Sequence, residues 1–490
     1  FIPNYIFHLG AGQNIFNYSY YGLMSPIILI SYLLPFIKME IFIATASIIL
    51  YTVTGILLYE FLNKHNISKK MSLLSAMAFQ TVAPITFQFH HHIMFVWYLP
   101  FLIMALYGVE EYLNKKKSFL LITSILLIIL TNYYYSVPSL MIIVIYGIYK
   151  LISKKEISFS TFAVDCLKAA IRIIIPILMT SFILIPTAYC MFKMERGTNS
   201  IVTIKELLLP HIGEILYSSF GIGLSFLLLI APFSTFCKKK PKIEEIFLSL
   251  SLIILTFFPP IMYLLNGKLY IRGKVLIPIL ILYIISLVKF ITDLSKDKIN
   301  LKRCGKFILL ILIILIISNL KSMLIIPLVI DALVTYICLV QFEKHKKLSI
   351  IYVPLILTLF ISSIGNNFNE TYIEENELEE EVIVEKLLKE VNDKSFYRTD
   401  NISDSNKNAN RVYKENFYTT SSYSSTYNTY YNDFYNNKIS NNIEHRNILN
   451  ISGANNYLFN KVMGVKYIVS PRKSNEVYNK IATINNVSLY

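Results

Sequence analysis

The chain has 490 residues, of which 54% are hydrophobic and only 16% are charged, and its formal net charge is +15 at pH 7. A soluble domain of this composition would expose large apolar patches, whereas a lipid bilayer accommodates them. The lysines lie in short clusters beside apolar runs, which membrane topology and anionic headgroups explain, so the charge does not indicate a nucleic-acid-binding protein.

Residues 1–39, of which 1–21 are polar and aromatic, are interpreted as a first extracytoplasmic loop. Candidate substrate-binding residues here are Gly12, Asn14, Tyr20 and Tyr21, because glycines admit a ligand to the backbone while amides and phenols hydrogen-bond sugars. A tight turn and an interfacial aromatic belt are the alternative, which these residues taken alone favour. The apolar stretch 22–36 is too short to span comfortably and predicts an interfacial helix.

Twelve apolar runs follow in residues 40–364, each near the roughly 20 residues that a helix needs to cross a bilayer. They cover residues 40–62, 71–89, 94–112, 119–132, 137–151, 169–190, 216–236, 246–265, 275–291, 307–319, 324–342 and 350–364. The pattern predicts a polytopic α-helical membrane protein with about 12 transmembrane helices in this sequence.

Every other connection between these runs is rich in basic residues, and such connections face the cytoplasm. They contain Lys64, Lys69, Lys70, Lys115, Lys116, Lys117, Lys154, Lys155, Lys238, Lys239, Lys240, Lys242, Lys302, Arg303, Lys306, Lys344, Lys346 and Lys347. The remaining connections and the tail are therefore expected outside, and any chemistry should face outward.

Residues 365–490 are expected to form a small extracytoplasmic α+β domain. Residues 374–391 carry an acidic helical pattern, and residues 416–423 and 465–470 alternate like short strands. The asparagine-rich stretches leave disorder open as an alternative. The tail contains no cysteine, which excludes a disulfide framework there.

Basic and imidazole side chains in the outer connections are candidate ligand contacts. The loop 266–274 contains Lys268, Arg272 and Lys274. The arginine guanidinium can bind a lipid-linked phosphate through two N–H groups, and the lysines add positive charge. Snorkelling interfacial cations are the alternative. Arg196 repeats the pattern in another outer loop. The candidate substrate contacts at the outer helix end are His90, His91 and His92, which do not form a metal site by their spacing alone.

Asp331 lies near the middle of an otherwise apolar run. An acid at that depth is costly, which makes it a functional candidate. A neutral carboxyl that is hydrogen-bonded between helices is the alternative.

The order of the motifs along nearly the whole chain resembles that of the YfhO family, bacterial multispan proteins placed among the GT-C-type glycosyltransferases. The motifs are Gly-x-Gly-x-Asn with the following Tyr-Tyr and Ser-Pro, the histidine cluster, residues 132–135 with Tyr134, Tyr270-x-Arg272, residues 396–398, 423–425 and 463–468. Each motif is loose, and the match depends on their order.

The resemblance implies that the protein transfers a sugar on the outer face from a polyprenyl-phosphate carrier to a cell-envelope polymer of the teichoic-acid type. It implies an acidic general base in the first outer loop, and basic groups that stabilise the departing phosphate, with Arg272 first and Lys268, Lys274 and Arg196 behind it. No cofactor is indicated with certainty, and a divalent metal stays open. Tyr134 joins the candidate substrate contacts.

Residues 1–39 contain no Asp or Glu. We therefore expect the catalytic base and a first transmembrane helix upstream of Phe1, and the family implies a last transmembrane helix beyond Tyr490. Two other classes remain open: a transporter or flippase for a lipid-linked sugar, and a non-catalytic envelope assembly protein. Transport predicts paired ionisable residues near the midplane and related halves, and neither is evident in the sequence.

Overall fold

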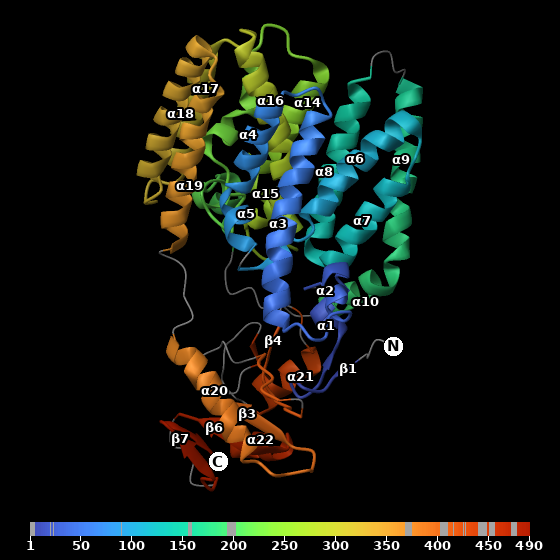
Figure 1. The fold of residues 1–490 in the computed structure, drawn as a ribbon, viewed down its shortest axis with the longest axis vertical. Helices are drawn as coiled ribbons and strands as arrows, with labels where there is room; N and C mark the ends of the chain where they lie inside the picture. Colours follow the sequence, from blue (N-terminus) through green and yellow to red (C-terminus); the bar gives the residue numbers. More distant parts are fainter. Residues whose placement is uncertain are drawn as a thin grey trace. The chain divides into compact units, whose positions relative to one another are not determined.

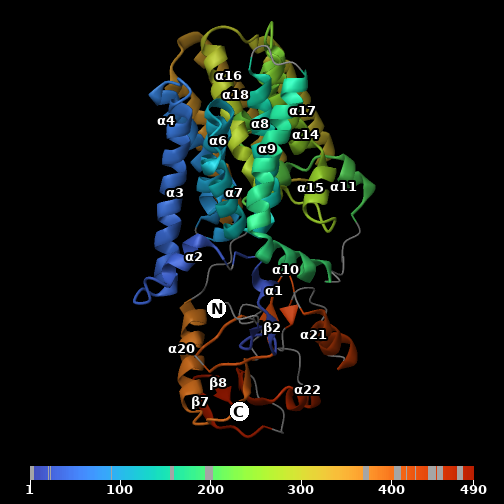
Figure 2. The same cartoon turned by 90° about the vertical axis from the view of Figure 1, so that its right-hand side faces the viewer.

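The computed structural model divides the chain into two compact units. One comprises residues 1–20, 182–197 and 371–490, and the other comprises residues 21–181 and 198–370. The structure describes residues 5–19, 21–22, 24–89, 91–154, 159–193, 202–367, 375–401, 410–414, 416–424, 426, 428–439, 448–449, 456–471 and 478–490. Figure 1 shows the ribbon, and Figure 2 shows it turned by 90°.

The larger unit is built of helices. In chain order the α-helices are α2 Pro26–Ser31, α3 Met39–Asn63, α4 Lys69–Gln80, α5 Ala83–Gln88, α6 Leu99–Lys115, α7 Phe119–Thr131, α8 Tyr133–Ile152, α9 Phe159–Met179, α11 Ile204–Leu208, α12 Ile212–Ile215, α13 Phe226–Ile230, α14 Ile243–Phe257, α15 Pro259–Leu265, α16 Leu280–Ser295, α17 Leu301–Ser318, α18 Ile325–His345 and α19 Tyr352–Asn367. Shorter 3₁₀ segments are η1 Ile93–Phe95, η2 Pro232–Cys237, η3 Gly273–Ile279 and η4 Leu348–Ile351.

Five helices among the described residues are long and apolar enough to cross a membrane: Met39–Asn63, Ile93–Lys115, Tyr133–Ile152, Gly273–Ser295 and Ile325–His345. The number rises to seven if two pairs of consecutive helices count as one span each, so the predicted count of about 12 transmembrane helices is not confirmed. Helix Gly273–Ser295 is the most enclosed, with 83% of its apolar window buried, while only 28% of that of α3 is buried. Apolar side chains exposed on α3 suit contact with lipid.

Three predicted spans are broken by residues that disfavour a continuous helix. In the run 246–265, α14 and α15 meet at an angle of 75° where α15 begins at Pro259. In the run 71–89, α4 ends at Gln80 and α5 begins at Ala83, with Pro84 in its first turn. In the run 216–236, only α13 and η2 are helical, because Gly221, Gly223 and Pro232 interrupt it.

Helix α18 packs against α17 and α19, and these three helices lie side by side in Figure 1. Helix α6 packs against α3, α7 and α8, and α16 contacts α4, α13 and α14. The apolar side chains of α16 are almost completely buried by these neighbours. The protein is thus a multi-pass helical membrane protein with α16 in its interior.

The smaller unit combines helices with short strands. Its elements are β1 Tyr5–Ile6, β2 Gln13–Asn14, α1 Phe16–Ser19, α10 Ser181–Phe192, α20 Glu375–Lys389, β3 Arg398–Asn401, β4 Ser422–Tyr423, α21 Thr429–Asp433, the π-helical η6 Phe434–Lys438, β5 Ile448–Leu449, α22 Tyr457–Val462, β6 Val465–Ser470, β7 Ala482–Ile484 and β8 Val487–Leu489. One sheet has the order β3-β6-β8-β7, with β3 and β6 parallel and the other pairs antiparallel. Helix α20 covers this sheet with Val384, Leu387 and Leu388.

The amino-terminal residues join the smaller unit through backbone hydrogen bonds. The Gly10 N–H donates to the Ser421 carbonyl at 2.8 Å, and the Thr419 N–H donates to the His8 carbonyl at 2.9 Å. The Asn428 N–H donates to Gln13 Oε1 at 3.2 Å. Residues 5–19 therefore fold together with the described residues of the tail. Helix α20 and strand β6 coincide with the predicted helix 374–391 and the predicted strand 465–470, whereas only residues 422–423 of the predicted strand 416–423 form a strand, β4.

Candidate functional site

An ion pair between Arg272 and Glu214 is the centre of the candidate site in the helical unit. Arg272 directly precedes η3 in extended backbone, and Glu214 lies in the short helix α12. Arg272 Nη1 donates to Glu214 Oε1 at 3.0 Å, and the Gly273 N–H donates to Glu214 Oε2 at 2.6 Å. The Arg272 side chain is 59% exposed and that of Glu214 only 13%. A largely buried carboxylate thus holds an accessible guanidinium in place.

Gly273 permits this arrangement because it lies against the backbone of α12. A Cβ at this position would lie 2.1 Å from the Glu214 carbonyl oxygen and 3.1 Å from the Ile222 nitrogen. The Ile222 N–H donates to the same carbonyl at 2.9 Å. The sequence therefore needs glycine here to bring the loop 266–274 within reach of Glu214.

A cavity of about 590 Å³ lies beside the ion pair. Its apolar wall includes Leu209, Ile215 and Met262. The polar and charged side chains of its lining are Thr203, Lys205, Glu206, His211, Glu214, Thr256, Tyr270, Arg272 and Ser318. The cavity is therefore suited to a ligand with both an ionic group and an apolar part.

Thr203 and Glu206 at the rim form a capping box at the start of α11. Each binds the backbone N–H of the other, and Thr203 Oγ1 also donates to Glu206 Oε2 at 2.9 Å. These hydrogen bonds lower the pKa of Glu206, with the backbone bond from Thr203 the largest cause. The carboxylate therefore remains ionised at neutral pH and holds one edge of the cavity.

Lys274 lies among aromatic rings two residues beyond Arg272. Its Nζ is 5.3 Å from the centre of the Phe95 ring, 5.8 Å from that of Tyr270 and 6.0 Å from that of Tyr134. These are cation–π distances. The rings keep the ammonium group near the amino-terminal end of the helix that begins at Gly273.

Tyr134 reaches the same loop through a hydrogen bond. Asn132 caps α8 by accepting from the Tyr135 N–H at 2.9 Å, which places Tyr134 in the first helical turn. The Tyr134 hydroxyl donates to Asn266 Oδ1 at 2.5 Å, and Asn266 Nδ2 donates to the Arg272 carbonyl at 3.1 Å. The predicted contact Tyr134 thus lies in one hydrogen-bond chain with the backbone of Arg272.

The histidines lie at the same end of the unit. Nδ1 of His91 is 2.6 Å from Nδ1 of His92, and Nδ1 of His92 is 3.1 Å from Gln88 Oε1. Burial lowers the pKa of His92 to about 4, and the charges of His91 and Lys274 contribute further. At neutral pH, His92 is therefore an uncharged imidazole that can accept or donate a hydrogen bond.

Gly12 and Asn14 lie in the smaller unit, where the turn itself accounts for them. Gly12 has a φ of +107°, and a Cβ there would lie 2.4 Å from the Tyr5 ring. Asn14 Oδ1 accepts from the Phe16 N–H at 2.9 Å. Tyr21 belongs to the helical unit and precedes α2 in a turn.

The other predicted contacts are not joined to Arg272 by any contact that the described residues show. Lys268 is exposed on the loop 266–274, with its backbone N–H bonded to the Tyr263 carbonyl at 2.9 Å. Arg196, Tyr20 and His90 lie outside the described residues. The structure thus brings together Arg272, Lys274, Tyr134 and His92 from the predicted set.

Asp331 is fully buried and tied to several elements. Its Oδ2 accepts from the Tyr217 hydroxyl at 2.9 Å and the Phe226 N–H at 3.1 Å, and its Oδ1 accepts from Thr335 at 3.3 Å. Thr358 on α19 adds a bond to Oδ2 at 3.3 Å. These bonds agree with the alternative of a carboxyl that joins helices.

Sequence reasoning missed Glu214, Asn266 and the capping box of α11. In the sequence, Glu214 is an acid in one predicted outer connection, and Arg272 and Lys274 lie in another. An acid and cations in connections on the same side could form an ion pair, and that was the available signal. Among the described residues, no group of three or more His, Cys, Asp or Glu side chains could hold a metal ion.

Comparison with known proteins gives one match. No curated protein and no solved structure matches the chain significantly. The family described as "Bacterial membrane protein YfhO" matches residues 4–490, which is essentially the whole chain. The chain therefore belongs to the YfhO family of bacterial membrane proteins.

Proposed function

We propose that the protein is a membrane glycosyltransferase that moves a sugar from a polyprenyl-phosphate carrier to a cell-envelope polymer, with the Arg272 site binding the donor phosphate. The observation that carries the proposal is the accessible Arg272 guanidinium, fixed by Glu214 at the edge of a cavity with an apolar wall. The family membership and the positive-inside orientation support an outward-facing site.

The guanidinium retains donors for a ligand. Arginine has five N–H groups, and the ion pair with Glu214 uses Nη1. The donors on Nε and Nη2 match the oxygens of a phosphate, which takes up negative charge as the bond to the sugar breaks. Because the carboxylate fixes the guanidinium before the ligand binds, little ordering is needed during the reaction.

Lys274 would supply a second positive charge on the same loop. The surrounding Tyr134 and Tyr270 offer ring faces, which suit the apolar face of a sugar. The neutral His92 imidazole adds a group that can donate or accept a hydrogen bond at pH 7. These side chains are proposed to orient the transferred sugar.

Glu214 is proposed as a positioning residue rather than the general base. Both of its oxygens accept hydrogen bonds, one from Arg272 and one from Gly273. Both oxygens are therefore engaged in holding Arg272 and the backbone of the loop 266–274 in place. The base remains the acidic residue that the family resemblance places in an earlier outer loop.

The test is mass spectrometry of envelope glycopolymers from cells that lack the gene and carry either the native protein or Arg272→Ala. We expect one sugar substituent to disappear with deletion and to return only with the native protein. Lys321→Ala is the matched control, because Lys321 is an exposed cation in the connection between α17 and α18. Equal amounts of each variant in the membrane must be verified.

Transport and assembly give different outcomes in the same cells and with purified protein. Proteoliposomes that contain a polyprenyl-phosphate sugar and the acceptor polymer should release free polyprenyl phosphate if the protein is a transferase. Movement of the intact donor between leaflets would instead identify a transporter. An unchanged polymer profile after deletion contradicts the proposal.

A further inference from the structure

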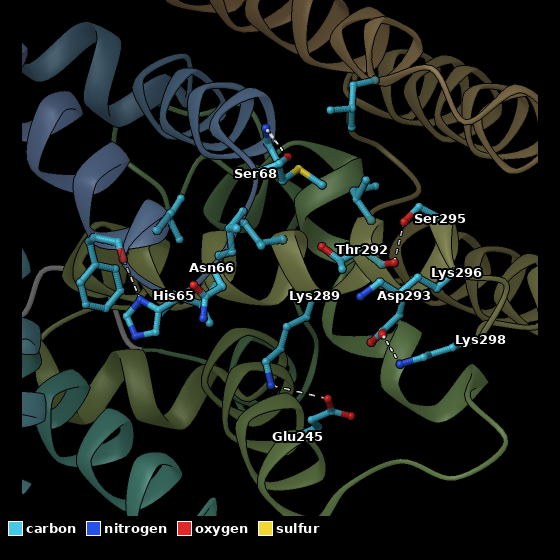
Figure 3. A pocket seen from close by; sticks show the side chains of 18 of the residues that line it. His65, Asn66, Ser68, Glu245, Lys289, Thr292, Asp293, Ser295, Lys296 and Lys298 are labelled. Carbon is cyan, nitrogen blue, oxygen red and sulfur yellow. Dashed lines mark hydrogen bonds and ion pairs between the residues drawn. The ribbon is translucent and has the colours of Figure 1, made fainter. Parts of the chain in front are cut away.

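A second cavity lies at the Lys-rich end of the helical unit and has a volume of about 870 Å³ (Figure 3). The ends of α3, α8, α14, α16 and α18 contribute to its wall. Helix Gly273–Ser295 has 23 residues, and Arg272 precedes it while Lys296 follows it. At about 1.5 Å per residue, the two cavities are separated by a helix on the order of 30 Å long.

Lysines dominate the charged lining of this cavity. The acids that line it among the described residues are Glu245 and Asp293. The lysines are Lys150, Lys242, Lys289, Lys296, Lys298 and Lys346. Because they come from several different helices and connections, the fold gathers their charge around one concavity.

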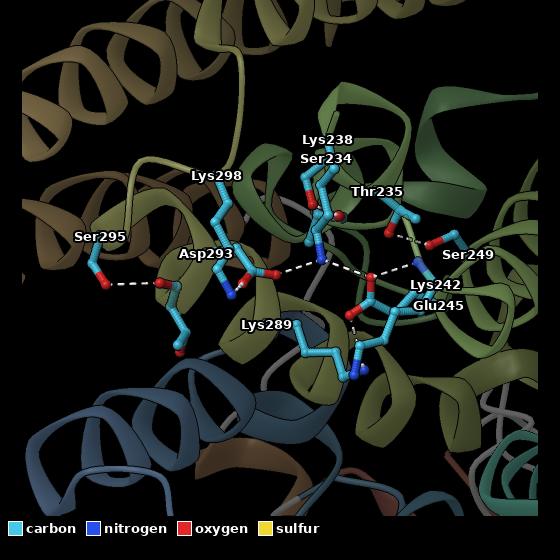
Figure 4. A network of polar contacts seen from close by, with 12 residues as sticks. Ser234, Thr235, Lys238, Lys242, Glu245, Ser249, Lys289, Asp293, Ser295 and Lys298 are labelled. Carbon is cyan, nitrogen blue, oxygen red and sulfur yellow. Dashed lines mark hydrogen bonds and ion pairs between the residues drawn. The ribbon is translucent and has the colours of Figure 1, made fainter. Parts of the chain in front are cut away.

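The two acids of the lining are already neutralised by the wall itself. The buried Lys238 lies between them and pairs with Asp293 and, at 2.9 Å, with Glu245 (Figure 4). Glu245 also pairs with Lys289 at 3.5 Å, and Asp293 with Lys298 at 3.7 Å. Three lysines thus share two carboxylates, which leaves net positive charge beside the cavity.

Most of the remaining lysines of the lining are paired as well, Lys346 with Asp297 at 2.5 Å and Lys242 with Glu244 at 3.8 Å. Lys150 pairs with the buried Glu110 at 2.7 Å, but this acid also accepts from the Tyr146 hydroxyl and contacts His65 Nε2, each at 2.5 Å. Among the ion pairs of the described residues, none includes Lys296. With Lys238, seven lysines thus stand against five carboxylates among the described ion pairs, so an anion that enters the cavity would meet an excess of positive charge.

The deeper wall of the cavity is apolar. It includes Phe61, Leu62, Met71, Ile285 and Val288. An apolar wall beneath a cationic rim suits a phosphate group, with or without an attached apolar chain, because ammonium groups bind phosphate as point charges.

We propose that this cavity is a binding site for a phosphate-type anion at the end of the protein expected to face the cytoplasm. The ligand is either the phosphate of an anionic lipid headgroup or a soluble phosphate, which share the same recognition chemistry. The site is separate from the proposed donor site at Arg272 and does not depend on it.

The experiment uses the full chain in nanodiscs and two probes. Inorganic phosphate is titrated into nanodiscs of phosphatidylcholine, and phosphatidylglycerol is added to a second set without phosphate. Thermal unfolding and native mass spectrometry measure binding, because a ligand of the folded state raises its unfolding midpoint. A response to phosphate identifies a soluble ligand, and retention of phosphatidylglycerol alone identifies a lipid.

The test variant is Lys296→Gln with Lys298→Gln, and the matched control is Lys302→Gln with Lys306→Gln. The control removes the same charge from exposed positions at the start of α17 that do not line the cavity. We expect the test variant to weaken binding of the effective probe at least about tenfold, and the control to leave it within about twofold.

Two results would overturn the proposal. Either neither probe binds the native protein, or the control loses as much affinity as the test variant, which would show only diffuse surface charge. If the double variant fails to accumulate, Lys296→Gln alone replaces it, because no ion pair of the described residues depends on Lys296.

Discussion

The two ends of helix Gly273–Ser295 use positive charge in different ways. At the Arg272 end, an exposed guanidinium meets one carboxylate at 3.0 Å. At the Lys296 end, the buried Lys238 joins two carboxylates inside the wall of a larger cavity. The positive-inside rule predicts lysines at the Lys296 end and disfavours cations at the Arg272 end. If the Arg272 end faces outward as predicted, its cations call for a functional explanation, whereas those at the Lys-rich end are already expected from topology.

The largest effect is expected from Lys238→Met, because it leaves Glu245 and Asp293 without their shared partner. Removing one member of a buried ion pair costs about 3–5 kcal/mol. We expect a strong fall in the thermal unfolding midpoint of the purified protein and less protein in the membrane. Lys240→Met is the control, because this neighbouring lysine is exposed. Equal stability of the two variants would show that the wall does not depend on Lys238.

Gly273→Ala should produce the next largest effect, at the opposite end of the helix. The added Cβ meets the backbone of Glu214 at 2.1 Å, so the loop must move and the Arg272 pair must open. Overpacking of this kind costs about 1–3 kcal/mol. Thermal unfolding and the envelope polymer profile measure the outcome.

Gly267→Asn is the matched control for that glycine. Gly267 has a φ of +67°, and a Cβ there would meet nothing within 4 Å. Asparagine tolerates this backbone region better than most residues. Equal damage from both substitutions would mean that the whole loop, rather than the approach to Glu214, is sensitive.

Arg272→Ala is expected to change stability less, since exposed ion pairs contribute about 1 kcal/mol or less. Glu214→Ala should cost more than Arg272→Ala, because it also removes the acceptor of the Gly273 N–H. Thermal unfolding of both variants gives the comparison. If Arg272→Ala were the more destabilising change, Arg272 would be a structural residue and the proposed phosphate role would lose its support.

The sequence predicted the helical parts of this fold better than their breaks. Eleven of the twelve apolar runs correspond to helices along most of their length, because hydrophobicity over a long window determines membrane insertion. The run 216–236 is the exception. It is apolar, but Gly221, Gly223 and Pro232 prevent a continuous helix there. The association of residues 5–19 with the tail could not be predicted, because single backbone hydrogen bonds such as that from Gly10 to Ser421 leave no periodic pattern.

Residue type and position identified part of the candidate site. Arg272 and Lys274 were evident because cations are unusual in outer loops. Glu214 was not, since its contact with Arg272 spans 58 positions in the sequence and depends on the close approach of Gly273. Gly12 and Asn14 illustrate the converse, because turn geometry gives the same residue pattern as a ligand loop.

The smallest predicted change concerns the titration of His92. Its pKa in the folded protein is about 4, through burial first and then the charges of His91 and Lys274. The unfolded chain titrates near 6.5. The unfolded state therefore binds more protons between these values, so this group's contribution to stability is complete above about pH 6.5 and is lost as the pH falls toward 4.

Nuclear magnetic resonance of histidine-labelled protein, assigned with His92→Gln, measures the pKa of His92. Lys274→Met should raise it by removing a positive charge, while Lys268→Met should not. A His92 that titrates near 6.5 in the native protein would mean that neither burial nor Lys274 acts on it, and that the outer end is more open to water than the Lys-rich end.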